Sequence, residues 1–350
     1  MKYWTDSFPG RSVTIENKEY LYFGGTSYLG LQTDATFQDI FIKNTRIFGT
    51  NYGASRKSNV QISVFEKAEN YLAELVGSEA CITLSSGYLA GQLVSQFLSN
   101  SKHPFFYAPN THSALYQHKI KTYDTFTALN TALRAQLSLD KESVPVVFLD
   151  SIDFSGMNYP NFDGLQLLPL DDIILVADDS HGIGIVGENG GGVYQKLKSF
   201  KPKELIVCCS LGKGYGVQGG AVFGFEKRIK ALQKTAFFGG ASPAAPVGLA
   251  TFLDSEEIYT QKRITLSSNI KLFTEGLREL NKFQSMPEHP SFGFVNEALS
   301  SHLEKNHILI TNFRYPDEDS KLLSRIIISA AHKKEDIQCL VGHLNTLSEN

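Results

Sequence analysis

The sequence lacks the features that mark several large classes of protein. No uninterrupted apolar run approaches the roughly 20 residues that a membrane-spanning helix needs. Neither sign of charge dominates, because the sequence contains 33 basic and 36 acidic residues. The chain therefore lacks the excess positive charge that would attract nucleic acid or an anionic membrane. The N-terminus carries no basic segment followed by an apolar stretch. We therefore expect a cytoplasmic protein that binds neither nucleic acid nor membrane.

Cysteine is scarce as well. The four cysteines are Cys81, Cys208, Cys209 and Cys339, and they show no metal-like paired spacing. The adjacent pair Cys208-Cys209 lies in an apolar run that is typical of a buried strand. The sequence therefore predicts four reduced cysteines in the core and no metal site.

Short apolar runs are what the sequence does contain in number. They cover residues 80–84, 105–108, 146–150, 173–178, 205–209 and 221–225. The runs are rich in β-branched or aromatic residues, and polar or helix-like segments separate most of them. This alternation predicts an α/β fold with a mostly parallel central sheet that carries helices on both faces.

Helical patterns flank these runs. Apolar residues from Val64 to Gly77 follow helical spacing, and Gly77 is suited to end that helix. After Pro243 the regular alternation stops. Helical spacing covers 247–252 and 264–277, and strand-like runs cover 308–311 and 326–328. We expect an N-terminal segment over residues 1–40, a large α/β domain over 41–243 and a smaller C-terminal α+β domain over 244–350.

A carboxylate and an imidazole follow one of the predicted strands. In an open α/β sheet, ligands bind outside the carboxyl ends of the strands, and Asp178-Asp179-Ser180-His181 stands at such an end. A buried carboxylate needs a cationic partner, and the protonated nitrogen of a pyridine cofactor is one. Two alternatives stay open. Asp179 could instead cap a following helix, or Asp178 and His181 could form half of a metal site.

A lysine set among glycines follows the next strand. Residues 210–216 read Ser-Leu-Gly-Lys-Gly-Tyr-Gly, with Lys213 at the centre. Flanking glycines let a bound ring approach the backbone, and a lysine becomes a nucleophile toward aldehydes when burial or a cationic neighbour depresses its pKa. Such a segment alone is usually an exposed loop. A phosphate-binding P-loop is excluded, because its first glycine and the Ser or Thr after Lys213 are absent.

Two further strand ends carry groups that suit a phosphorylated aromatic ligand. Ser85-Ser86-Gly87-Tyr88 is a small-residue turn before a helical pattern, where free N–H groups and the positive end of the helix dipole favour a phosphate. His112 follows the strand at 105–108, and its imidazole could stack on a ring. Each signal is weak alone, since Ser-Ser-Gly is commonly an ordinary turn and a lone histidine is commonly structural.

Taken in order, these motifs resemble the α-oxoamine synthase family of fold-type I enzymes, which depend on pyridoxal 5′-phosphate (PLP). The resemblance runs from about Tyr20 to the C-terminus and includes Tyr28-Leu29-Gly30-Leu31 and Arg325 to His332. It implies a homodimeric C-acyltransferase that condenses an amino acid with an acyl-CoA, with decarboxylation, to an α-amino ketone. An aminotransferase, racemase or lyase on the same fold stays open, as does a non-catalytic regulatory protein.

The resemblance implies catalytic and ring-binding roles for five residues. Lys213 would carry PLP as a Schiff base and act as acid and base at the substrate α-carbon. Asp178 would pair with the pyridine nitrogen, and His112 would stack on the ring. His181 and Ser155 would face the phenolic oxygen of the cofactor.

The resemblance also implies five contacts to the phosphate and the substrate. The backbone of Gly87 and Tyr88, with the hydroxyl of Ser210, would hold the phosphate. Arg325 would bind the amino-acid carboxylate in a bidentate pair. Thr26 stands where the family usually has a substrate-contacting asparagine, so that contact is altered.

Overall fold

The computed structural model describes residues 2–101, 103–117, 122–140, 142–314, 319 and 322–347 of the chain. The chain divides into two compact units. The larger unit contains Asp39–Asp153 and Met157–Glu256, and the smaller contains Met1–Gln38, Phe154–Gly156 and Glu257–Asn350. The domain bounds expected from the sequence stay a prediction.

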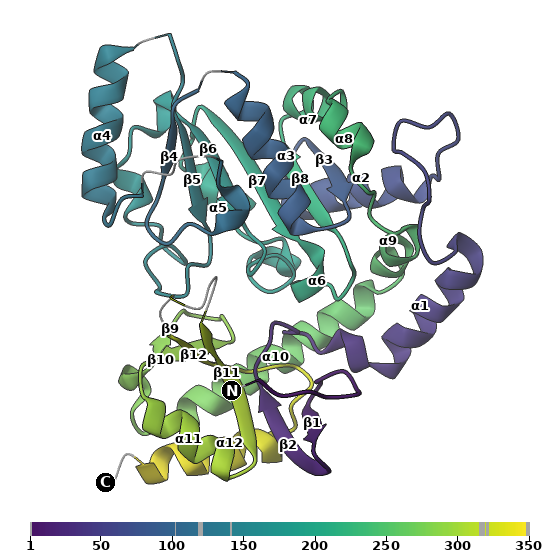
Figure 1. Ribbon diagram of the computed structural model, residues 1–350, viewed down its shortest axis with the longest axis vertical. Coiled ribbons are helices and arrows are strands. Elements are labelled where there is room, and N and C mark those ends of the chain that lie inside the picture. The colour runs from purple at the N-terminus through teal and green to yellow at the C-terminus, as the bar shows by residue number, and fades with distance from the viewer. Residues whose placement is uncertain are drawn as a thin grey trace. The chain divides into compact units, whose positions relative to one another are not determined.

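A six-stranded sheet forms the centre of the larger unit (Figure 1). Its strands, in spatial order, are β3 (Ala80–Leu84), β8 (Gly220–Gly224), β7 (Glu204–Ser210), β6 (Ile174–Asp178), β5 (Val146–Asp150) and β4 (Phe105–Tyr107). Strands β4 to β7 are parallel, and β8 runs antiparallel to both of its neighbours. The predicted mostly parallel sheet is confirmed.

Helices cover both faces of this sheet because its strands are apolar on both sides. Helices α3 (Gly87–Ser99) and α7 (Glu226–Gln233) share a buried cluster with alternate strand residues, such as Ile82, Val176 and Cys208. Helix α2 (Val64–Val76) packs on β3, and α5 (Tyr194–Ser199) packs on β7. Gly77 ends α2 with φ of 76°, as the sequence predicts. Further helices are α1 (Ala35–Phe48), α4 (Phe126–Leu139), α6 (Leu211–Gly214), α8 (Ala236–Gly240) and α9 (Pro246–Leu253).

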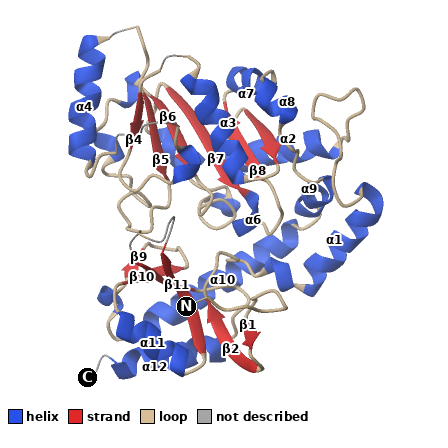
Figure 2. Cartoon of the chain, viewed as in Figure 1, coloured by secondary structure: helices blue, strands red, loops and turns tan. Residues whose placement is uncertain are grey.

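The smaller unit is built on a second sheet, whose strands are drawn in red in Figure 2. Its strand order is β1 (Ser12–Ile15), β2 (Lys18–Phe23), β11 (Ile308–Arg314), β12 (Leu322–Ile327), β10 (Ser291–Phe294) and β9 (Gln284–Ser285). Its helices include α10 (Glu256–Gly276), α11 (Glu297–Lys305) and α12 (Lys334–Leu347). The predicted smaller α+β part is confirmed, although the sequence did not predict that the N-terminal strands β1 and β2 join its sheet.

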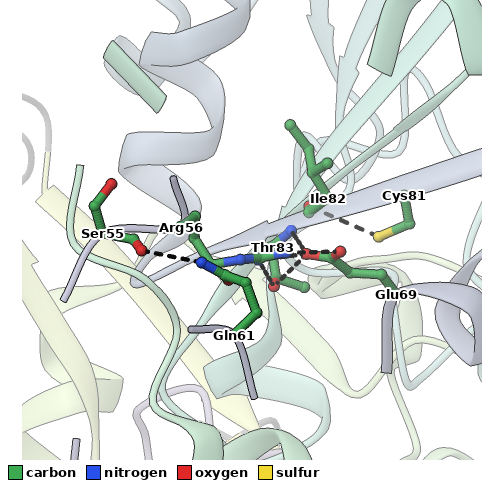
Figure 3. Close-up of polar contacts among 7 residues, drawn as sticks. All are labelled: Ser55, Arg56, Gln61, Glu69, Cys81, Ile82 and Thr83. Carbon is green, nitrogen blue, oxygen red and sulfur yellow. Dashed lines mark hydrogen bonds and ion pairs between the residues drawn. The ribbon is translucent and has the colours of Figure 1, made fainter. Parts of the chain in front are cut away.

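A buried ion pair ties the loop before α2 to that helix and to β3 (Figure 3). Nη1 and Nη2 of Arg56 bind the carboxylate of Glu69 at 2.7 and 3.0 Å, and the two side chains are 9% and 7% exposed. Glu69 also accepts hydrogen bonds from the backbone N–H and the hydroxyl of Thr83, both at 2.8 Å. The guanidinium lies 4.1 Å from the ring centre of Phe65. The loop is therefore fixed to β3 just before the turn at 85–88.

We expect Glu69→Ala to lower the free energy of unfolding by about 3–5 kcal/mol, because it leaves the buried Arg56 without its counter-charge. Urea unfolding of the parent and the variant would measure the loss. Glu74→Ala is the matched control, because Glu74 lies on the same helix but is exposed. Equal losses in the two variants would contradict a stabilising role for the ion pair.

The cysteine prediction is correct at three positions and wrong at the fourth. Cys81, Cys208 and Cys209 are buried, whereas Cys339 is exposed, and all four are free. Cys339 lies on α12 between the buried Ile337 and Leu340, at a position that helical spacing turns toward solvent. Among the residues that the structure describes, no helix is both long and apolar enough to cross a membrane.

Candidate active site

Four parallel strands of the larger unit end at one edge of the sheet, and a titratable residue follows or ends each of them. His112 follows β4, Asp150 ends β5, Asp178 ends β6 and Lys213 follows β7. The topology explains this gathering, because the carboxyl ends of parallel strands face the same way.

Lys213 and His181 meet directly at this edge. Nζ of Lys213 lies 2.8 Å from Nε2 of His181. The turns that carry them are also joined, since the backbone N–H of Ser210 donates to the hydroxyl of Ser180 at 2.9 Å. Gly214 follows Lys213, and a Cβ there would lie 2.1 Å from the carbonyl oxygen of Ile183. Only glycine permits this close approach, so the turn that carries Lys213 packs directly on the backbone of the loop that carries His181.

Asp178 is buried at the end of β6, with 7% of its surface exposed. Its Oδ1 accepts a hydrogen bond from the backbone N–H of Ser180 at 2.8 Å, which fixes the orientation of the carboxyl group. A buried carboxylate at a sheet edge is well suited to hold a cationic ring nitrogen.

Asp179 organises the loop that carries His181, a role that the sequence did not predict. One carboxylate oxygen accepts from the hydroxyl of Ser151 at 2.6 Å, and the other accepts from the backbone N–H of Val193 at 3.0 Å. The side chain thus closes the loop between residues 180 and 193. Burial raises the pKa of Asp179 to about 7.

This raised pKa predicts a pH dependence of stability. The folded chain keeps the Asp179 proton up to about pH 7, whereas the unfolded chain loses it near the ordinary value of 3.8. The stability that this group contributes is therefore complete below about pH 4 and is lost as the pH rises through 7, with a slope of at most about 1.4 kcal/mol per pH unit. Urea unfolding between pH 5 and 8 should show this slope in the parent relative to Asp179→Asn. A slope of the opposite sign would contradict the assignment.

The imidazole of His112 is held in one orientation beside these groups. Its Nδ1 accepts a hydrogen bond from the backbone N–H of Ala114 at 3.1 Å. Burial lowers the pKa of His112; the charge of Asp178 opposes this shift and that of Lys213 adds to it. The ring is therefore neutral, with its proton on Nε2.

The turn between β3 and α3 offers groups for an anion. Gly87 begins the 13-residue helix α3, and Ser86 caps it by accepting from the N–H of Leu89 at 3.2 Å. A Cβ on Gly87 would lie 2.8 Å from both the Cβ and the backbone nitrogen of Ser210, so this turn packs against the turn that leads to Lys213. The helix N-terminus beside a serine hydroxyl forms a suitable cradle for a phosphate.

The remaining predicted residues belong to the smaller unit. Arg325 lies on β12, and its guanidinium is 3.6 Å from the ring centre of Phe154. Burial lowers its pKa. Ser155 follows Phe154 in the chain, and Thr26 lines a cavity of about 250 Å³ together with Tyr22 and Ser329. The predicted residues therefore form two groups, one in each unit, and their roles stay predictions.

The chain belongs to the class I and II aminotransferase family, because the model of that family matches residues 19–344. Curated relatives within it include 8-amino-7-oxononanoate synthases. The one from Alcanivorax borkumensis is 27% identical, over 97% of this chain and 92% of the relative. The one from Nitrosomonas europaea is 28% identical, over 96% and 92%. The resemblance to the α-oxoamine synthases is thereby confirmed.

Solved structures show the same fold. Serine palmitoyltransferase from Sphingomonas wittichii matches with a TM-score of 0.79 and 19% identity, over 99% of this chain and 92% of that one. 8-Amino-7-oxononanoate synthase from Francisella tularensis matches with a TM-score of 0.71 and 19% identity, over 94% and 98%. Another neighbour, described as SPT with PLP, has a TM-score of 0.78. The predicted fold of the PLP-dependent transferases is confirmed.

The residues at the sheet edge fit PLP chemically. An amine for the aldehyde is present in Lys213, and its neighbour His181 is 2.8 Å away. Asp178 is a buried carboxylate for the ring nitrogen, and the cradle of Gly87 and Ser210 suits a phosphate. No group in this set conflicts with an anionic, aromatic aldehyde.

Proposed function

We propose that this chain is a PLP-dependent C-acyltransferase of the α-oxoamine synthase type, similar to 8-amino-7-oxononanoate synthase. It condenses an amino acid with an acyl-CoA, releases CoA and carbon dioxide, and yields an α-amino ketone. The observation that supports this most is the contact of 2.8 Å between Lys213 and His181, at the strand edge that also carries the buried Asp178. A cytoplasmic location stays part of the proposal.

Each residue at the strand edge has a distinct task in this proposal. When bound, PLP supplies an electron sink for the negative charge that develops at the substrate α-carbon. Asp178 keeps the ring nitrogen protonated by its charge, and the neutral His112 covers a ring face. Ser210 and the N–H groups of Gly87 and Tyr88 bind the phosphate.

Lys213 transfers the proton in this proposal. Its amine accepts the proton that leaves the α-carbon and later donates a proton. His181, at 2.8 Å from that amine, fixes its orientation and, with Ser155, faces the phenolic oxygen. Arg325 binds the substrate carboxylate, because its planar guanidinium matches two carboxylate oxygens at once.

We further propose a homodimer, which exposed apolar side chains support. Phe41, Ile42 and Ile47 on α1 and Val60 beyond it are 39%, 52%, 65% and 70% exposed, and exposed apolar surface of this kind marks protein interfaces. Sedimentation velocity should show a species of two chains, and Ile47→Glu should shift it toward one. Ile264→Glu is the control, because Ile264 is similarly exposed at 57%. A parent that sediments as one chain with full turnover would contradict the dimer.

Two measurements together test the function: exchange of the α-proton of the amino acid, and release of free CoA. The chain loaded with PLP is incubated in D₂O with a panel of amino acids, with and without acyl-CoA. We expect α-deuteration of one or a few amino acids and release of free CoA only when such an amino acid is present. Deuteration with transfer of the amino group to a keto acid, and no CoA release, would instead identify an aminotransferase. Absence of both reactions would leave a non-catalytic protein.

A further inference from the structure

Asp150 is a carboxyl group at the sheet edge to which neither the motifs nor the proposed reaction gives a task. It is the last residue of β5 and pairs in register with Asp178, the last residue of β6. Partners in register on parallel strands project to the same face, about 4.8 Å apart. Asp150 is partly buried. Two carboxyl groups therefore leave adjacent strand ends side by side.

Backbone contacts distinguish the two carboxyl groups. Asp178 accepts from the N–H of Ser180 at 2.8 Å, within the turn that leads to His181. The side chain of Asp150 accepts from the backbone N–H of His112. The carbonyl oxygen of Asp150 accepts from Nδ2 of Asn158 at 2.6 Å, which fixes the strand end. Asp150 thus connects β5 to the residue that follows β4.

Two carboxylates side by side repel each other, and this repulsion disfavours the state in which both are charged. Burial raises the pKa of Asp150 well above its ordinary range, and the charge of Asp178 raises it further, while Lys213 and the N–H of His112 oppose the shift. Burial and the neighbouring carboxylate thus both favour the neutral form of Asp150.

We propose that Asp150 is a positioning residue of this site, whose neutral carboxyl group anchors the backbone of His112 and leaves Asp178 as the one negative charge of the pair. The contact to His112 fixes the backbone, and the bond from Ala114 to Nδ1 fixes the ring. A single negative charge then matches a single ring cation. The consequence for PLP rests on the proposed function, whereas the state of Asp150 and its hold on His112 do not.

Infrared spectroscopy of the protein without PLP tests the neutral state directly. At pH 8, the C=O band of a protonated carboxyl group should be present in the parent and lost in Asp150→Asn. Asp179→Asn is the matched control, because Asp179, with its pKa of about 7, is mostly ionised at that pH. A band that persists in Asp150→Asn would overturn the proposal.

Hydrogen exchange tests the anchor. Asp150→Asn keeps a carbonyl oxygen that can accept from His112, whereas Asp150→Leu has none. The amide of His112, followed by mass spectrometry of its peptide, should exchange about tenfold or more faster in the Leu variant than in the parent. The Asn variant should restore slow exchange. Equal exchange rates in the parent and the Leu variant would refute the anchor. If the Leu variant does not fold, the infrared comparison with Asp150→Asn still tests the neutral state of Asp150.

PLP binding completes the test and separates the two hypotheses. Affinity for PLP should fall about tenfold or more in Asp150→Leu and return toward that of the parent in Asp150→Asn. A Leu variant that binds PLP as tightly as the parent would contradict the positioning role. A parent that binds no PLP would refute the proposed function, while the infrared and exchange results would still decide the state of Asp150.

Discussion

Lys213→Ala is expected to lower α-proton exchange of the substrate amino acid by about 10⁴-fold, because no other group replaces an amine that acts as both acid and base at the α-carbon. The variant should still bind PLP without a covalent bond, since the proposed phosphate and ring contacts come from other residues. Deuterium uptake into the amino acid, measured by mass spectrometry, gives the rate. Lys227→Ala is the control, because Lys227 is exposed on α7.

Borohydride reduction of the parent with PLP provides a second measurement for the same residue. The cofactor should become fixed to one peptide, and fragmentation should locate it on Lys213. Label on another lysine would remove the basis of the proposed function, whatever the activity of the alanine variant.

Asp178→Asn should slow α-proton exchange by about 10²–10³-fold, because it removes the charge that keeps the ring nitrogen protonated. The carbonyl oxygen of asparagine can still accept from the N–H of Ser180, so the strand end should keep its shape. The exchange rate with saturating PLP is the measurement. Asp171→Asn is the control, because Asp171 is exposed. A variant that exchanges at the parent rate would show that Asp178 does not have this role.

The apolar strands of the larger sheet were predictable, because a strand buried on both faces forms a nearly continuous apolar run in the sequence. Strands β3 and β5 begin and end where the sequence predicts. The hairpin of β1 and β2 was missed for a physical reason. Its turn residues, Glu16 and Asn17, both have positive φ, at 50° and 62°. The usual signal for such a turn is Asn-Gly or Asp-Gly, and Glu-Asn does not provide it.

Site residues were predictable where a distinctive residue stands among small ones. Lys213 among glycines and His181 after two aspartates are of this kind, and the structure brings the two within 2.8 Å. Asp150 gave no such signal, because a single aspartate at the end of an apolar run is ordinary. Its place beside Asp178 depends on strand register, which the sequence does not state. Asp179 was missed as an organiser of its loop because its partners Ser151 and Val193 are distant in sequence.

The glycine contacts around Lys213 have a consequence for how this protein can be altered. At Gly214 and Gly87 the neighbouring atoms are mainly backbone, and backbone cannot change rotamer to admit a new side chain. Substitution of either glycine should therefore inactivate the protein. Thr26 instead lines a cavity of the smaller unit, where there is space for a different side chain. A library aimed at new substrates should diversify residues of that kind and leave the lysine and phosphate turns constant.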